Sequence, residues 1–102
     1  MDELSDMKEG LHKARSGLIR VLVRTENGAV SDIIISGDFI LSPEHFIDTM
    51  EEALMGVPAS REDVLKRLKA FFRDNSFQSP QTYPEDFTEA IMKALGVQEE
   101  KT

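Results

Sequence analysis

Two stretches between residues 17 and 36 alternate apolar and polar side chains and are rich in β-branched residues. The stretches Leu18–Arg24 and Val30–Ile35 flank the tripeptide Glu26-Asn27-Gly28. An Asn-Gly pair between two such stretches is a strong signal for a tight turn, because both residues tolerate a positive φ angle. The pattern therefore predicts a β-hairpin over residues 17–36.

The register of this hairpin depends on the length of its loop. A two-residue loop at Asn27-Gly28 would place Asp32 opposite Val23. A three-residue loop, with Gly28 in a left-handed bulge position, shifts the pairing by one residue. We favour the second register because it gathers apolar side chains on one face, namely Ile19, Val21, Val23, Ile33 and Ile35. The other face then carries Arg20, Arg24, Asp32 and Ser36 with Leu18, Leu22 and Ile34, and we expect something to cover part of it.

After the hairpin, the apolar spacing changes to three and four residues, which is typical of amphipathic helices. Ser42-Pro43 predicts the start of the first helix, since a hydroxyl N-cap and a proline in the first turn both suit that position. Ser60 resembles a second N-cap, and Pro84 opens the third pattern. We therefore expect helices over about residues 43–55, 61–73 and 84–95.

Gly37-Asp38 interrupts the hairpin pattern, and Phe39-Ile40-Leu41 forms either a short third strand or an extended connector. We expect a flexible N-terminal segment over residues 1–12, a single domain over residues 13–96 and a polar tail over residues 97–102. Together these elements predict an α+β fold, in which a small antiparallel sheet, with or without a third strand, packs against about three helices.

The composition limits the possible functions. With 102 residues, 40% of them hydrophobic and 30% charged, the chain fits one globular domain. Its net charge of -7 opposes binding to phosphate backbones and so disfavours a nucleic-acid partner. It contains 0 cysteines, which excludes disulfides and thiolate chemistry. The acidic N-terminus is unlike a signal peptide and no apolar run has the length of a membrane span, so we expect a cytoplasmic protein without a membrane partner.

One basic stretch stands out in this acidic chain. Between Gly10 and Arg24 there are four positive residues and no acid, the four being Lys13, Arg15, Arg20 and Arg24. The stretch is either an ordinary solvated strand face or a patch that faces an acidic partner or a nucleotide.

Few residues could carry out chemistry. His12 and His45 are isolated along the sequence, and neither has a spacing typical of a metal site. Asp48 and Glu52 lie four residues apart, which is typical of the solvated face of a helix. The glycines occur singly, so no glycine-rich loop could hold a phosphate. We predict no catalytic residue, no metal site and no cofactor site in this chain.

The segment Ile33-Ile34-Ile35-Ser36-Gly37-Asp38-Phe39 belongs to a longer ordered set. Lys13-Ala14 and Gly17-Leu18-Ile19-Arg20-Val21 precede it, and Glu52-Ala53-Leu54-Met55-Gly56-Val57 and Ser60-Arg61-Glu62-Asp63-Val64 follow. In this order and at this spacing, the set resembles the C-terminal accessory domain of lipoate-protein ligases. In many archaea and some bacteria that domain is a separate small subunit. The resemblance covers roughly residues 13–72.

The resemblance implies a non-catalytic accessory subunit that forms a heterodimer with a catalytic lipoate-protein ligase subunit. That partner would bind lipoate, ATP and Mg, activate lipoate to lipoyl-AMP, and transfer the lipoyl group to a lysine of an acyl-carrier domain, either of E2 or of the glycine-cleavage H protein. The accessory domain would be needed chiefly for activation, where closing over the site supplies orientation and excludes water.

The resemblance also leads us to place a set of residues at or behind the contact with the catalytic subunit. These are Lys13, Gly17, Gly37, Asp38 and Phe39. The competing hypothesis is that they are turn and core residues only, since Gly37 can supply an unusual backbone angle and Phe39 can return the chain to the core.

The family fold is related to the SufE/NifU-like fold of iron-sulfur assembly proteins. Sulfur or cluster transfer requires cysteine, which this chain does not contain, so we set that function aside. A different alternative stays open. The chain could be a free-standing protein-protein interaction module that has this fold and no role in a ligase.

Overall fold

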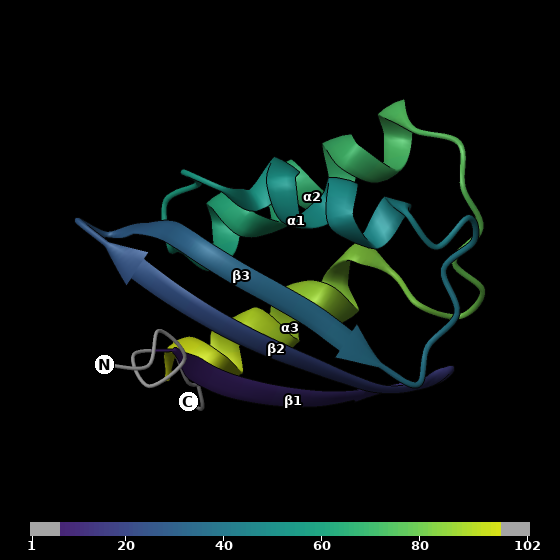
Figure 1. Cartoon of the computed structure of the whole chain (residues 1–102), viewed down its shortest axis with the longest axis horizontal. Coiled ribbons are helices and arrows are strands. Elements are labelled where there is room, and N and C mark those ends of the chain that lie inside the picture. The colour runs from purple at the N-terminus through teal and green to yellow at the C-terminus, as the bar shows by residue number, and fades with distance from the viewer. Residues whose placement is uncertain (1–6, 97–102) are drawn as a thin grey trace.

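A three-stranded antiparallel sheet forms one side of the molecule, and helices cover only one of its faces (Figure 1). The computed structural model describes residues 7–96. The strands β1 (Lys8–Ala14), β2 (Gly17–Glu26) and β3 (Ala29–Gly37) lie side by side in that order. The helices α1 (Phe46–Leu54), α2 (Arg61–Asp74) and α3 (Pro84–Leu95) follow. The predicted α+β fold and hairpin are confirmed, whereas the relation to the SufE/NifU-like fold stays a prediction.

The third strand lies at the N-terminal end of the sheet, where the sequence pattern predicted flexible chain. The expectation of a flexible segment over residues 1–12 was wrong for residues 8–12, which belong to β1. The inward positions of this strand include Gly10 and Ala14 rather than branched side chains, so its apolar pattern is weak. Residues 39–41 form an extended connector, the second of the two forms expected for them. Residues 1–6 and the expected tail at 97–102 lie outside the described residues.

The predicted pairing of β2 with β3 is correct, but the predicted loop is not. Val21 pairs with Ile35 and Val23 with Ile33, as expected. The loop nevertheless has two residues, Asn27 and Gly28, whose φ angles of 54° and 79° are those of a tight hairpin turn.

The extra residue that sets this register lies further along the strand. A bulge between Arg24 and Thr25 shifts the pairing, so Ser31 has no partner in the ladder. The Ser31 hydroxyl donates to the carbonyl oxygen of Arg24 at 3.1 Å. The register therefore depends on a bulge within the strands and not on a longer loop.

The second and third helices match their predicted ranges, and the first begins later than predicted. α1 starts at Phe46 because the backbone of Ser42 is paired with Gln78 through two hydrogen bonds of 2.9 and 2.8 Å and does not cap a helix. Ser60 does cap α2, since its hydroxyl accepts the N–H of Asp63 at 3.2 Å. α3 begins at Pro84, and Gly96 follows it.

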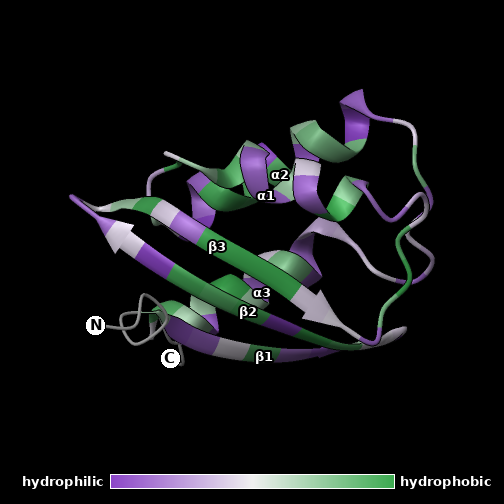
Figure 2. Ribbon diagram, viewed as in Figure 1, coloured by the Kyte–Doolittle hydropathy of each residue, from purple (hydrophilic) through white to green (hydrophobic). Residues whose placement is uncertain are grey.

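The core lies between the inner face of the sheet and the helices. α3 packs on β1 and β2, α1 packs on β3, and α2 packs against both helices. Figure 2 shows the apolar residues that recur along β2 and β3 and on the helices. The largest fully buried side chains include Phe87, Ile19, Met50, Leu54, Leu68 and Ile91. The opposite face of the sheet is left without a covering element among residues 7–96, and we call it the open face.

Candidate functional site

Four of the five residues selected from the sequence meet at one end of the sheet. Gly17 starts β2, Gly37 ends β3, and the N–H of Asp38 donates to the carbonyl oxygen of Leu18 at 2.8 Å. Lys13 pairs with Leu18 from the side of β1. Residues far apart in the sequence therefore form one continuous surface at the sheet end. The side chain of Phe39 points away from this surface and into the core.

Glycine at position 37 is required by the close approach of two chains. Its φ angle is 146°, and a Cβ there would lie 2.0 Å from the carbonyl oxygen of Leu18. A Cβ at Gly17 would lie 2.9 Å from the Cβ of Asp38. No side chain fits at such distances without moving the backbone. The two glycines therefore determine the shape of the sheet end. This agrees with the hypothesis that they are present for structural reasons, as turn residues.

Phe39 and Ile40 point in opposite directions from the connector. The ring of Phe39 packs edge-on against Phe87, with 5.2 Å between the ring centroids. Ile40 is 61% exposed, which is the largest value among the exposed large hydrophobic residues of the described chain. Phe39 anchors the connector, so Ile40 and Asp38 are held out toward solvent.

A shallow pocket of about 470 Å³ lies beside this connector. Its lining consists of Ile35, Ser36, Gly37, Phe39, Ile40, Leu41, Ser42, Glu44 and Ile47. The lining is mixed, because five apolar side chains lie beside two serines, a glycine and one carboxylate. This composition suits an apolar side chain better than an anionic ligand, because Glu44 repels negative charge. We call the exposed residues Lys13, Asp38 and Ile40, together with the pocket, the sheet-end surface.

Glu51 of α1 protects the outer edge of β3. Its carboxylate accepts the N–H of Ile35 at 2.8 Å, a group that has no partner strand on that side. Burial raises the pKa of Glu51, the neighbouring charges of Asp48 and Asp32 raise it further, and the hydrogen bond from Ile35 opposes them. Farther along the same edge, Val30 is paired through its backbone with Gly56 and Val57.

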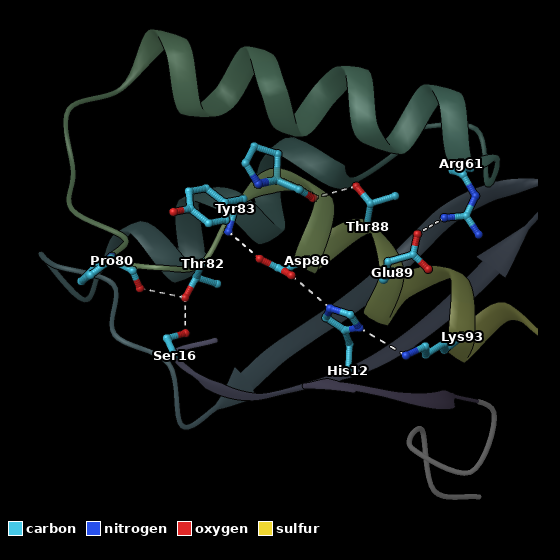
Figure 3. Close-up of polar contacts among 11 residues, drawn as sticks. His12, Ser16, Arg61, Pro80, Thr82, Tyr83, Asp86, Thr88, Glu89 and Lys93 are labelled. Atoms are coloured by element: carbon cyan, nitrogen blue, oxygen red, sulfur yellow. Dashed lines mark hydrogen bonds and ion pairs between the residues drawn. The ribbon is translucent and has the colours of Figure 1, made fainter. Parts of the chain in front are cut away.

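His12 is part of a polar contact between β1 and α3 (Figure 3). Lys93 donates from Nζ to Nδ1 of His12 at 3.2 Å, and Nε2 lies 3.0 Å from Oδ1 of Asp86. An ammonium group can only donate, so Nδ1 is the acceptor and Nε2 donates to the carboxylate. Both ring nitrogens of His12 are therefore engaged within the protein.

The sequence pattern gave no sign of this contact, since His12 and Asp86 are 74 residues apart. The same helix end is held by two further bonds. The N–H of Tyr83 donates to Oδ2 of Asp86 at 2.9 Å, and the hydroxyls of Ser16 and Thr82 are hydrogen-bonded to each other. These contacts attach the β1–β2 turn to the start of α3, which is a structural role.

The basic stretch lies partly on the open face, where its charges are compensated. Arg20 forms an ion pair with Glu9, and Arg24 forms one with Asp32 at 3.3 Å. Leu11 and Ile34 lie on the same face and are 46% and 41% exposed. The open face is thus a mixed surface of leucine, isoleucine and paired charges. It does not form the concentrated positive field that a nucleotide site would need.

Among residues 7–96, no group of three His, Cys, Asp or Glu side chains is arranged to hold a metal ion. Over the same range, no helix is both long and apolar enough to pass through a lipid bilayer.

The comparisons with known proteins agree with the architecture. A family model described as the C-terminus of bacterial lipoate protein ligase matches residues 8–91. The lipoate-protein ligase A subunit 2 of Thermoplasma acidophilum is 37% identical over 79 residues, which are 78% of this chain and 81% of the relative. A solved chain at 35% identity has a TM-score of 0.73 and matches over 83% of this chain and 93% of its own length. It comes from a structure described as a bi-partite lipoate protein ligase and its E2 lipoyl domain from the same archaeon.

Proposed function

This chain belongs to the family of bacterial lipoate protein ligase C-terminal domains, and we propose that it is the accessory subunit of a two-subunit lipoate-protein ligase. One observation carries the proposal. At 35% identity, the chain matches 93% of a chain from a structure described as a bi-partite lipoate protein ligase.

We propose that a catalytic partner binds lipoate, ATP and Mg and performs both chemical steps in the cytoplasm. In the first step a carboxylate oxygen of lipoate attacks the α-phosphorus of ATP, and pyrophosphate leaves. In the second step the amine of a carrier lysine attacks the carbonyl carbon of lipoyl-AMP, and AMP leaves. The first step must bring two anions together, and its mixed anhydride must be kept from water. A second subunit closing over the site meets both needs without a catalytic residue of its own.

We propose that the sheet-end surface contacts the catalytic subunit. Ile40 is 61% exposed and lines a shallow pocket of mixed polar and apolar character, and an exposed branched side chain in such a place can serve as an interface anchor. Asp38 lies next to it, and its backbone is fixed by the bond to Leu18. In this proposal Gly17, Gly37 and Phe39 shape the surface from behind, while Lys13 lies at its margin.

Reconstitution with a catalytic subunit tests the proposal. Ile40→Ser and Asp38→Ala should each reduce lipoyl-AMP formation about fivefold or more, because loss of an interface anchor costs roughly 1 kcal/mol or more. Met55→Ser is the control, since Met55 is 44% exposed and precedes Gly56, whose N–H donates to Val30 near the opposite end of β3. Preformed lipoyl-AMP should bypass the defect, so lipoyl transfer should remain near the wild-type rate.

Two results would contradict parts of this proposal separately. Full adenylation by both sheet-end variants would show that the contact lies elsewhere. If the wild-type chain neither binds the catalytic subunit nor stimulates lipoyl-AMP formation, the accessory role is wrong, and a free-standing interaction module becomes the better account.

A further inference from the structure

Within residues 7–96, no strand pairs with the outer edge of β1, and the backbone groups along this edge follow a defined pattern. In an antiparallel ladder, alternate residues bond to the neighbouring strand and the others point away from it. Ala14 and Gly17 form the closing pair of the β1–β2 turn. The residues of β1 whose backbone bonds to β2 are therefore Ala14 and every second residue before it. Glu9, Leu11 and Lys13 consequently direct their N–H and C=O groups outward.

The pairing on the other side of β2 supports this assignment. The N–H of Ile35 donates to Glu51 and not to β2, so its partner Val21 must form its ladder bonds with Gly10 of β1. The two edges of the sheet differ in their protection. Glu51, Gly56 and Val57 cover parts of the β3 edge, whereas no residue of the described chain pairs with the backbone of β1 along its outer edge.

We propose that this edge pairs with β1 of a second copy of the chain, antiparallel and centred on Leu11. This register places Leu11 opposite Leu11, and Glu9 opposite Lys13 of the second copy, twice by symmetry. The residues that meet are those whose backbone groups point outward, so each such group finds a partner. Two three-stranded sheets become one continuous sheet.

The charges on the edge select this register over its neighbours. Sliding the second strand by two residues in either direction places Leu11 opposite a charged side chain and breaks both ion pairs. Larger shifts bring Glu9 to Glu9 or Lys13 to Lys13, which repel each other. Charged side chains on an edge strand usually prevent pairing. In β1, by contrast, only the register centred on Leu11 places Glu9 of each copy opposite Lys13 of the other.

Cysteine cross-linking tests the register directly, because the natural chain contains 0 cysteines. Directly opposed residues of a bonded antiparallel pair have Cα atoms about 5.5 Å apart, which is within the range of a disulfide. Leu11→Cys should therefore oxidise to a covalent dimer at least roughly tenfold faster than Leu18→Cys. Leu18 is the matched control, since it is 38% exposed on the same face but lies on the central strand. Equal rates for the two variants, or no dimer from Leu11→Cys, would overturn the proposal.

A mixing experiment tests the ion pairs by sedimentation at high protein concentration. Glu9→Lys alone and Lys13→Glu alone should each weaken self-association roughly tenfold, because each creates two like-charge contacts between the copies. Glu9→Lys also removes the ion pair with Arg20 of its own chain, so Lys13→Glu is the cleaner of the two variants. An equimolar mixture of the two variants should associate again, since every Lys then faces a Glu. Arg15→Glu makes the same charge change in the adjacent turn and should leave association unchanged. Failure of the mixture to recover, or equal effects of Arg15→Glu and Lys13→Glu, would refute the pairing.

Both experiments use the chain without any ligase partner. Their outcome is therefore independent of the accessory role, and a monomer in these assays would leave the reconstitution result unaffected. If the β1 edge instead receives a strand of another protein, Leu11→Cys remains monomeric by itself, and self-pairing is refuted.

Discussion

Replacing Gly10 by alanine tests how tightly β1 packs on α3. A Cβ at this position would lie 2.2 Å from the carbonyl oxygen of Ala90 and 2.3 Å from the backbone nitrogen of Ala94. Both contacts are with helix backbone, so no flexible side chain can move aside. The strand and helix must separate by about 1 Å to accommodate a methyl group.

The expected cost follows from this geometry. Inserting a methyl group into a packed core usually costs about 1–3 kcal/mol, and a clash with backbone lies at the upper end of that range. For a domain of this size, about 3 kcal/mol corresponds to a fall in melting temperature of roughly 12–24 °C. Thermal unfolding followed by circular dichroism would measure it.

Gly28→Ala provides the matched control. No atom lies within 4 Å of a Cβ at this turn position, but its φ angle is 79°. The control therefore introduces backbone strain without a clash, at a cost of about 1–2 kcal/mol. A melting temperature for Gly10→Ala within a few degrees of the wild type, or above that of Gly28→Ala, would refute the close packing of β1 on α3.

Three further predictions concern the supports of the sheet end and of α3. Phe39→Ala should lower the free energy of unfolding by about 2–3 kcal/mol in urea titrations, because it removes a half-buried ring that packs on Phe87. Burial raises the pKa of Glu51 above its ordinary value, so the folded state binds this proton more tightly than the unfolded state. The wild type should lose stability as the pH rises through that raised pKa, and thermal melts of Glu51→Gln should lack this loss. Asp86→Ala should cost about 1–2 kcal/mol, because it removes both the N-terminal hydrogen bond of α3 and the contact with His12, while the exposed neighbour Glu85→Ala should change the melting temperature little.

Local signals predicted most of the secondary structure. The hairpin and two of the three helices follow from periodicity and from caps such as Ser60, which act within a few residues. β1 was missed because its buried positions Gly10 and Ala14 are small, and at Gly10 the backbone of α3 leaves no room for a side chain. The start of α1 was misplaced because Ser42 bonds to Gln78, a partner that local sequence does not reveal.

Only those features of the candidate site that depend on residues close together in the sequence could be predicted. The resemblance selected Gly17 and Gly37, and the structure shows why neither position tolerates a side chain. The protection of Ile35 by Glu51 and the contact of His12 with Asp86 join distant parts of the chain. Such pairs have no periodicity of their own, because each partner alone resembles an ordinary surface residue.

The proposed pairing of two chains is geometrically compatible with the proposed ligase contact. The sheet-end surface lies at the Lys13 end of β1, and an antiparallel arrangement points the two copies of that end in opposite directions. Lys13 belongs to both surfaces, so in the dimer the ligase contact of each copy would rest on Asp38, Ile40 and the pocket. Adding a catalytic subunit should accordingly leave the Leu11→Cys dimer intact and bind to both of its halves. A cross-linked dimer that fails to bind a catalytic subunit, while the monomer binds it, would show that the two surfaces overlap.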